Sequence, residues 1–186
     1  MPLIKEKKIS INYYKLLPEG APYQLIKGKL IMTPAPNPVH QIILGRFFRT
    51  LSEFVEDKKA GMVLFSPVNL YLNDKNAFQP DIIFLSKDGN AVIKRDGIYG
   101  APDIVIEILS PSTAHYDLRE KFKVYERTGV REYWIVDPDM KTVEVYINDG
   151  GAFSLKYKVE VKGEVGSTVL ENFKIKLEEI FTDLPF

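Results

Sequence analysis

The segment APDIVIEILSPST, residues 101–113, carries a carboxylate, Glu107, in the middle of an apolar run and between two isoleucines. A second apolar run, QPDIIFLSKDG at residues 79–89, also opens with a Pro-Asp pair. Both runs are nearly continuous in apolar residues, which predicts two strands covered on both faces. A buried carboxylate without a partner is costly, so Glu107 needs a raised pKa or a compensating cation. These two strands are therefore the expected centre of the fold and of its chemistry.

The two carboxylates can meet if the two predicted strands are neighbours. Side chains alternate along a strand, so Glu107 shares a face with Val105 and Leu109, and Asp81 begins the other strand. Converging carboxylates repel each other unless a cation lies between them, and Mg²⁺ is usually held by one or two carboxylates with water and phosphate oxygens. The structural alternatives are an ion pair between Glu107 and a basic residue of the next helix, and a strand-capping role for Asp81.

The surrounding elements predict an α/β fold of the mixed α+β kind, with a central mixed sheet flanked by helices and additional antiparallel strands at the C-terminus. The segment that follows residue 36 predicts a long helix, with Asn37 as N-cap, Pro38 at the first helical position and Gly61 at its end. The other expected elements are a helix at 10–17, a hairpin at 23–32, an interrupted strand at 62–72, strands at 132–137 and 142–147, and a short C-terminal helix.

Residues 113–128 predict the helix that follows the Glu107 strand. Leu118, Phe122 and Tyr125 fall on one stripe of this helix, and Asp117 lies four residues before Lys121. One interpretation makes Asp117 and Lys121 a surface pair worth roughly 0.3–0.5 kcal/mol. The other has Lys121 reach back over the sheet to Glu107.

Composition narrows the classes of function. The 186 residues are expected to form a single domain, 1–186, and 25 basic against 25 acidic residues give no general attraction to nucleic acid or anionic membrane. The absence of cysteine excludes thiolate chemistry, and two histidines exclude a three-histidine zinc site within one chain. No apolar stretch has the length of a signal peptide or a membrane span, so a cytoplasmic location without membrane contact is expected.

The order of motifs QPDIIFLS, GAPDIVIEILSPST and DLREKFKVYERTGVREYWIVDP resembles the Uma-type restriction endonuclease family, within the PD-(D/E)XK restriction-endonuclease-like superfamily. The resemblance covers residues 10–150, and it implies a restriction-endonuclease-like core and metal-dependent hydrolysis of nucleic-acid phosphodiesters. It further implies Mg²⁺, or Mn²⁺, as cofactor and DNA as the first partner to consider, and it is compatible with a homodimer.

Carried over by motif, the resemblance makes Asp81 and Glu107 metal ligands and catalytic residues, with Lys121 as the catalytic lysine. The superfamily places its lysine two residues after the glutamate, where this chain has Leu109, and some members supply it from the following helix. Related chains often carry glutamates where this chain has Gln24 and Lys29.

His40, in the segment PNPVHQ, also matches a recurrent position of the family. The favoured interpretation is a structural histidine at a helix start, bonded to nearby backbone. Two other classes of function stay open for the chain: a non-catalytic nucleic-acid or protein-binding module on the same fold, and a structural protein that oligomerises through its C-terminal sheet.

Overall fold

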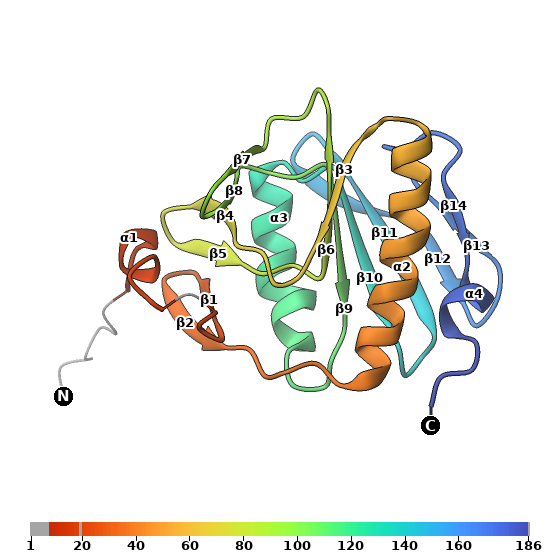
Figure 1. The fold of residues 1–186 in the computed structure, drawn as a ribbon, viewed down its shortest axis with the longest axis horizontal. Helices are drawn as coiled ribbons and strands as arrows, with labels where there is room; N and C mark the ends of the chain where they lie inside the picture. Colours follow the sequence, from red (N-terminus) through yellow and green to blue (C-terminus); the bar gives the residue numbers. More distant parts are fainter. Residues whose placement is uncertain (1–7, 19, 186) are drawn as a thin grey trace.

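A six-stranded mixed sheet forms the centre of the molecule in the computed structural model, which describes residues 8–18 and 20–185 (Figure 1). Its strand order is β12-β11-β10-β9-β6-β3. The strands are β3 (Gly61–Phe65), β6 (Ile82–Ser86), β9 (Ile104–Ile108), β10 (Glu132–Asp137), β11 (Thr142–Asp149) and β12 (Ala152–Glu160). Strands β9 and β10 are parallel, and the other neighbours are antiparallel.

Two helical segments cover opposite faces of this sheet because its strands alternate their side chains between two apolar clusters. Helix α2 (Pro38–Asp57) packs on the face that presents Ile82, Ile106 and Trp134. Helix α3 (Phe122–Thr128) packs on the face that presents Ile83 and Val105. The central strands are buried on both sides, as their continuous apolar runs predict.

A second sheet lies beside the central one, with strand order β2-β1-β5-β4-β8-β7 (Figure 1). Its strands are β1 (Tyr23–Ile26), β2 (Lys29–Met32), β4 (Leu70–Asn73), β5 (Asn76–Phe78), β7 (Val92–Lys94) and β8 (Gly97–Tyr99). The short helix α1 (Ile11–Tyr14) lies next to this sheet, with Tyr14 packed on Leu25, Tyr71 and Ala77. The C-terminal region adds the hairpin β13 (Glu164–Gly166) and β14 (Lys174–Lys176), and then helix α4 (Leu177–Phe181).

Several expected elements are confirmed with their local signals. Asn37 caps α2 by accepting a hydrogen bond from the backbone N–H of His40 at 2.8 Å, and Pro38 is the first helical residue. The hairpin of β1 and β2 turns at Lys27 and Gly28, both with positive φ. The expected mixed sheet flanked by helices is present.

Other expectations were wrong in detail. Helix α2 ends at Asp57, before Gly61, which opens β3 instead. The expected strand at 62–72 is two strands in different sheets, β3 and β4, separated by a cis peptide bond at Ser66–Pro67. The chain therefore crosses from the central sheet to the second sheet at this proline.

The helix predicted at 113–128 begins as a π-helix, η1 (Tyr116–Lys121), and continues as α3. A π-turn holds more residues than an α-turn, so side chains before it rotate relative to an α-helical pattern. Leu118 consequently lies 45% exposed rather than on the apolar stripe, whereas Asp117 and Lys121 are buried. No helix in the described part of the chain is long and apolar enough to span a lipid bilayer.

Candidate active site at the end of the central sheet

The first pair of candidate residues meets across the antiparallel strands β6 and β9. Ile82 pairs with Ile106, and the same register continued by one residue sets Asp81 opposite Glu107. Residues directly opposite each other on antiparallel strands point to the same face of the sheet. The Asp81 carboxylate is also fixed here, because its Oδ2 accepts a hydrogen bond from the backbone N–H of Ile108 at 2.8 Å.

Lys121 reaches Glu107 from the helical segment that follows β9. Its Nζ donates to Glu107 Oε1 at 2.9 Å, and the hydroxyl of Tyr125, four residues further along, donates to the same oxygen at 2.7 Å. Glu107 is 3% exposed and Lys121 4% exposed, so this ion pair is shielded from water. The expected approach of Lys121 to Glu107 is confirmed, while Lys123, two residues on, is exposed to solvent.

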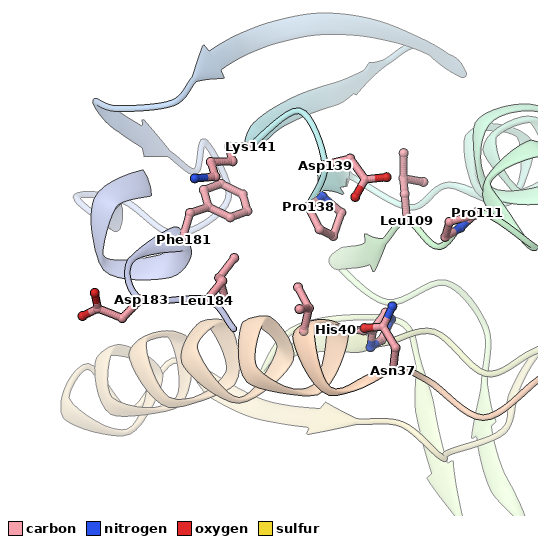
Figure 2. Close-up of a pocket in the computed structure, with 11 residues that line it drawn as sticks. Asn37, His40, Leu109, Pro111, Pro138, Asp139, Lys141, Phe181, Asp183 and Leu184 are labelled. Atoms are coloured by element: carbon pink, nitrogen blue, oxygen red, sulfur yellow. Dashed lines mark hydrogen bonds between the residues drawn. The ribbon is translucent and has the colours of Figure 1, made fainter. Parts of the chain in front are cut away.

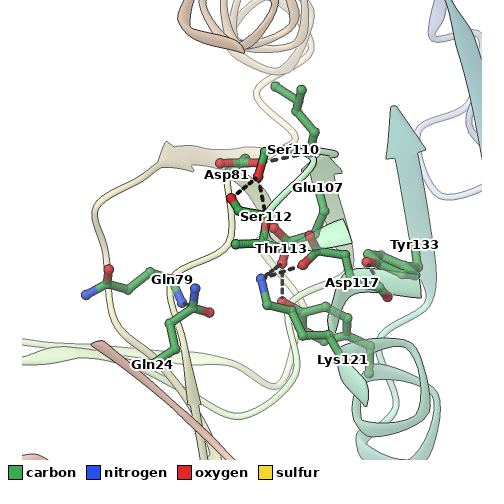
Figure 3. Close-up of polar contacts among 12 residues, drawn as sticks. Gln24, Gln79, Asp81, Glu107, Ser110, Ser112, Thr113, Asp117, Lys121 and Tyr133 are labelled. Carbon is green, nitrogen blue, oxygen red and sulfur yellow. Dashed lines mark hydrogen bonds and ion pairs between the residues drawn. The ribbon is translucent and has the colours of Figure 1, made fainter. Parts of the chain in front are cut away.

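Asp117 is a third buried carboxylate, which one of the two interpretations of the sequence placed on the surface. Its Oδ1 lies 2.8 Å from Lys121 Nζ, and its exposed fraction is 3%. Lys121 therefore lies between two buried carboxylates, Asp117 and Glu107 (Figure 3). The interpretation of Asp117 and Lys121 as a weak surface pair was wrong, because both side chains are buried.

Three carboxyl groups share one lysine in this cluster. Burial raises the pKa of Glu107 to about 8; Lys121 opposes this rise, and the charges of Asp117 and Asp81 add to it. Burial likewise raises the pKa of Asp117. Burial alone would lower the pKa of Lys121, but the two carboxylates raise it above its ordinary value, so the ammonium stays charged. One lysine thus faces three carboxylates.

His40 adds a titratable group on the far side of Asp81. Its Nε2 lies 3.1 Å from Asp81 Oδ2, and Asp81 raises the pKa of His40 against the lowering effect of burial. The expectation that the His40 ring bonds to nearby backbone was wrong, because its ring contacts a carboxylate from another element. Within the described part of the chain, the buried Nδ1 of His40 has no hydrogen-bond partner.

Gln24 lies near the carboxylate cluster, on strand β1 of the second sheet (Figure 3). It is 5% exposed, and its Oε1 accepts a hydrogen bond from the backbone N–H of Gln79 at 3.1 Å. This bond ties strand β1 to the segment that leads into Asp81. Gln24 therefore holds in place the segment that leads into Asp81, and as a neutral side chain it adds no negative charge to the carboxylate cluster.

A recess of about 660 Å³ opens next to His40. Its lining includes Asn37 and His40 from the start of α2, and Leu109 from the end of β9 (Figure 2). The opposite wall contains Asp139 and Lys141. Leu109 thus faces this recess at the position where the superfamily pattern has a lysine.

The donor groups suit a hard divalent cation. Oδ1 of Asp81 and Oε2 of Glu107 accept no hydrogen bond from the described residues, which leaves one oxygen on each carboxylate available. A cation bound there would take the place of the proton that Glu107 retains at its raised pKa. Among residues 8–18 and 20–185, no three histidine or acidic side chains form a complete metal site, so water and substrate oxygens would fill the remaining positions.

Comparison with known proteins assigns the family. The family model described as "Putative restriction endonuclease" (Uma2) matches residues 12–178. The chain belongs to the Uma2 family. A crystal structure of "a putative nuclease belonging to DUF820" from Anabaena variabilis ATCC 29413 superposes with a TM-score of 0.77 at 21% identity, covering 94% of this chain and 98% of that one. A search of curated proteins finds no match.

The Uma2 assignment and this structural likeness establish a restriction-endonuclease-like fold. The roles of Asp81, Glu107 and Lys121 as catalytic residues, and of the first two as metal ligands, stay predictions. Sequence reasoning missed Asp117 and Tyr125 as partners of this cluster. Their spacing carried a signal, because Asp117, Lys121 and Tyr125 recur every four residues and therefore share one side of a helix.

Proposed function

We propose that this protein hydrolyses phosphodiester bonds of nucleic acid, DNA first among them, with Mg²⁺ or Mn²⁺ held by Asp81 and Glu107. The observation that carries the proposal is the strand register that continues to Asp81 opposite Glu107, together with the ion pair between Glu107 and Lys121. Membership of the Uma2 family agrees with it. A cytoplasmic location and a homodimer stay predictions.

Each residue would contribute a separate part of the reaction. When bound, the cation would polarise the scissile phosphate and lower the pKa of a water ligand. Lys121 would stabilise the negative charge that develops on the phosphate, or orient the attacking water, because its ammonium stays protonated between Glu107 and Asp117. His40 and the backbone N–H of Ile108 would orient the carboxylate of Asp81.

A nucleic-acid or protein-binding module without catalysis is the second candidate. It is favoured by the internal pairing of Lys121, whose ammonium already contacts Glu107 and Asp117. It is also favoured by Leu109, which stands where the superfamily pattern has its lysine. A cleavage assay separates the two candidates.

The test uses supercoiled plasmid, single-stranded DNA and RNA, each incubated with Mg²⁺, Mn²⁺ or EDTA. The wild-type protein is expected to cleave with either metal and not with EDTA. Glu107→Gln keeps the size of the side chain and removes its charge, so it should abolish cleavage while the circular dichroism spectrum is retained. Equal cleavage by both proteins would assign the activity to another site or to a contaminant. No cleavage by the wild-type protein with either metal would favour the binding module.

A further inference from the structure

A second recess, of about 540 Å³, lies between helix α1 and the second sheet. It is lined by the aromatic rings of Tyr14 and Tyr71, the amides of Asn69 and Gln79, and the cations of Lys15 and Arg95. This volume is within the range of pockets that bind small ligands. Resting on the function proposed above, we propose that this recess binds an unpaired nucleotide of the substrate strand, next to the phosphate that is cleaved.

Proximity to the carboxylate cluster supports this assignment. Gln79 lines the recess and precedes Asp81 by two residues, so their Cα atoms are at most about 7.6 Å apart, given ~3.8 Å per residue. The hydrogen bond from the Gln79 backbone to Gln24 fixes this short connection. A nucleic-acid strand that placed a phosphate at Asp81 would reach the recess with a neighbouring nucleotide.

The charge of the recess suits a phosphate. Lys15 pairs with Asp96 at 3.1 Å, and its ammonium lies 4.7 Å from the centres of the Tyr71 and Tyr99 rings. Arg95 is exposed and makes no ion pair or hydrogen bond with the described residues. A guanidinium without a partner at the edge of a recess is available for two parallel hydrogen bonds to a phosphate.

The amide groups of the recess suit a base. Asn69 Oδ1 accepts hydrogen bonds from the Tyr14 hydroxyl at 3.1 Å and from Gln79 Nε2 at 3.2 Å, and these bonds fix the orientation of both amides. Within the described residues, Gln79 Oε1 accepts no hydrogen bond. Asn and Gln amides are frequent partners of base edges. A recess admits a base only when the base has left its stack, so the expected ligand is single-stranded or unpaired.

The recess beside His40 is the poorer candidate. Its described lining contains two acids, Asp139 and Asp183, against Lys141. The described lining of the recess beside α1 has Lys15 and Arg95 against Asp96. Repulsion between acids and phosphate therefore favours the recess beside α1 for the substrate strand.

The experiment measures binding rather than cleavage. The Glu107→Gln protein is titrated, in EDTA, into a fluorescein-labelled single-stranded oligodeoxynucleotide and into its duplex, at several salt concentrations. Added to this background, Arg95→Glu is expected to weaken single-strand binding on the order of 10-fold and to reduce the salt slope by about 0.7, the value for one phosphate contact. Gln79→Ala should weaken binding by a smaller factor with the salt slope unchanged.

Lys174→Glu is the matched control, because Lys174 is an exposed cation on β14, outside both sheets that border the site. Equal weakening by Arg95→Glu and Lys174→Glu, or equal binding of duplex and single strand, would overturn the inference. The outcome is independent of the proposed function: binding lost through Arg95→Glu without any metal-dependent cleavage supports the recess and rejects the nuclease. Metal-dependent cleavage by the wild-type protein supports the nuclease, and if Arg95→Glu changes neither this cleavage nor the binding, the recess is rejected as the nucleotide site.

Discussion

Two glutamates are buried in adjacent strands of the central sheet, and their surroundings differ. Glu132, fully buried in β10, accepts hydrogen bonds from Trp134, Ser167, Thr168 and Val169. Glu107, in the neighbouring strand β9, has two donors on one oxygen and two further carboxylates nearby. Neutral donors of the protein satisfy both oxygens of Glu132, whereas Glu107 shares one lysine with two further carboxyl groups and retains a proton that a cation can replace.

Removal of Glu132 should have the largest effect on stability. Glu132→Ala would leave the buried donors of the 167–169 loop and of Trp134 without an acceptor, so we expect a loss of about 3–5 kcal/mol in the free energy of unfolding. Glu107→Gln should cost under about 1 kcal/mol, because Tyr125 can still donate to the amide oxygen and Lys121 keeps Asp117. Urea unfolding without metal measures both. Similar losses for the two variants would remove the distinction between the glutamates.

Removal of the lysine tests the Glu107 cluster from the other side. Lys121→Ala would leave Glu107 and Asp117 without their cation, and we expect a loss of about 3 kcal/mol at pH 8. The loss should be smaller at pH 5, where these carboxyls take up protons. Lys123→Ala, which removes the exposed neighbouring lysine, is the control and should change the unfolding midpoint little. An unmoved midpoint for Lys121→Ala would show that the buried ion pair contributes nothing to stability.

The pH dependence of stability should depend on Glu107. Its pKa is about 8 in the folded protein against an ordinary value of 4.5, so the folded state binds the extra proton between these pH values. Stability without metal should therefore fall as pH rises from about 4.5 to 8, and Asp117 acts in the same direction. The Glu107→Gln protein should show a shallower fall. Parallel unfolding curves for the two proteins across this window would contradict a raised pKa.

Divalent metal should have the smallest of the four effects. At ten times its dissociation constant, Mg²⁺ would stabilise the wild-type protein by about 1.4 kcal/mol, because it binds only the folded state. Thermal unfolding with Mg²⁺, and again after EDTA, measures this gain. Asp81→Asn and Glu107→Gln should each lose it. A gain retained in both variants would locate the metal elsewhere.

The sequence was sufficient to find the strands that carry the site. Long apolar runs and their Pro-Asp openings predicted β6 and β9, and the alternation of side chains predicted the face of Glu107. Asn37 and Pro38 predicted the start of α2, and this signal also comes from neighbouring residues of the chain. Each of these features depends on residues close together in the chain, which is why pattern reasoning reached them.

Features that depend on distant partners were not predictable in the same way. The strands β5, β7 and β8 have three residues each, too few for a periodic pattern, and they are defined by pairing within the second sheet. Three of the residues that donate to Glu132 lie 35 to 37 residues further along the chain. His40 meets Asp81 only because α2 begins beside the start of β6, and this arrangement is tertiary.

The π-turn in η1 has a consequence for how this chain can vary in length. Each residue of an α-helix rotates the chain by about 100°. Deletion of one residue between Asp117 and Lys121 would shorten their spacing from four residues to three and so change the geometry of their ion pair. Insertions and deletions should therefore be tolerated better at Gly150 and Gly151, between β11 and β12, than in this six-residue segment.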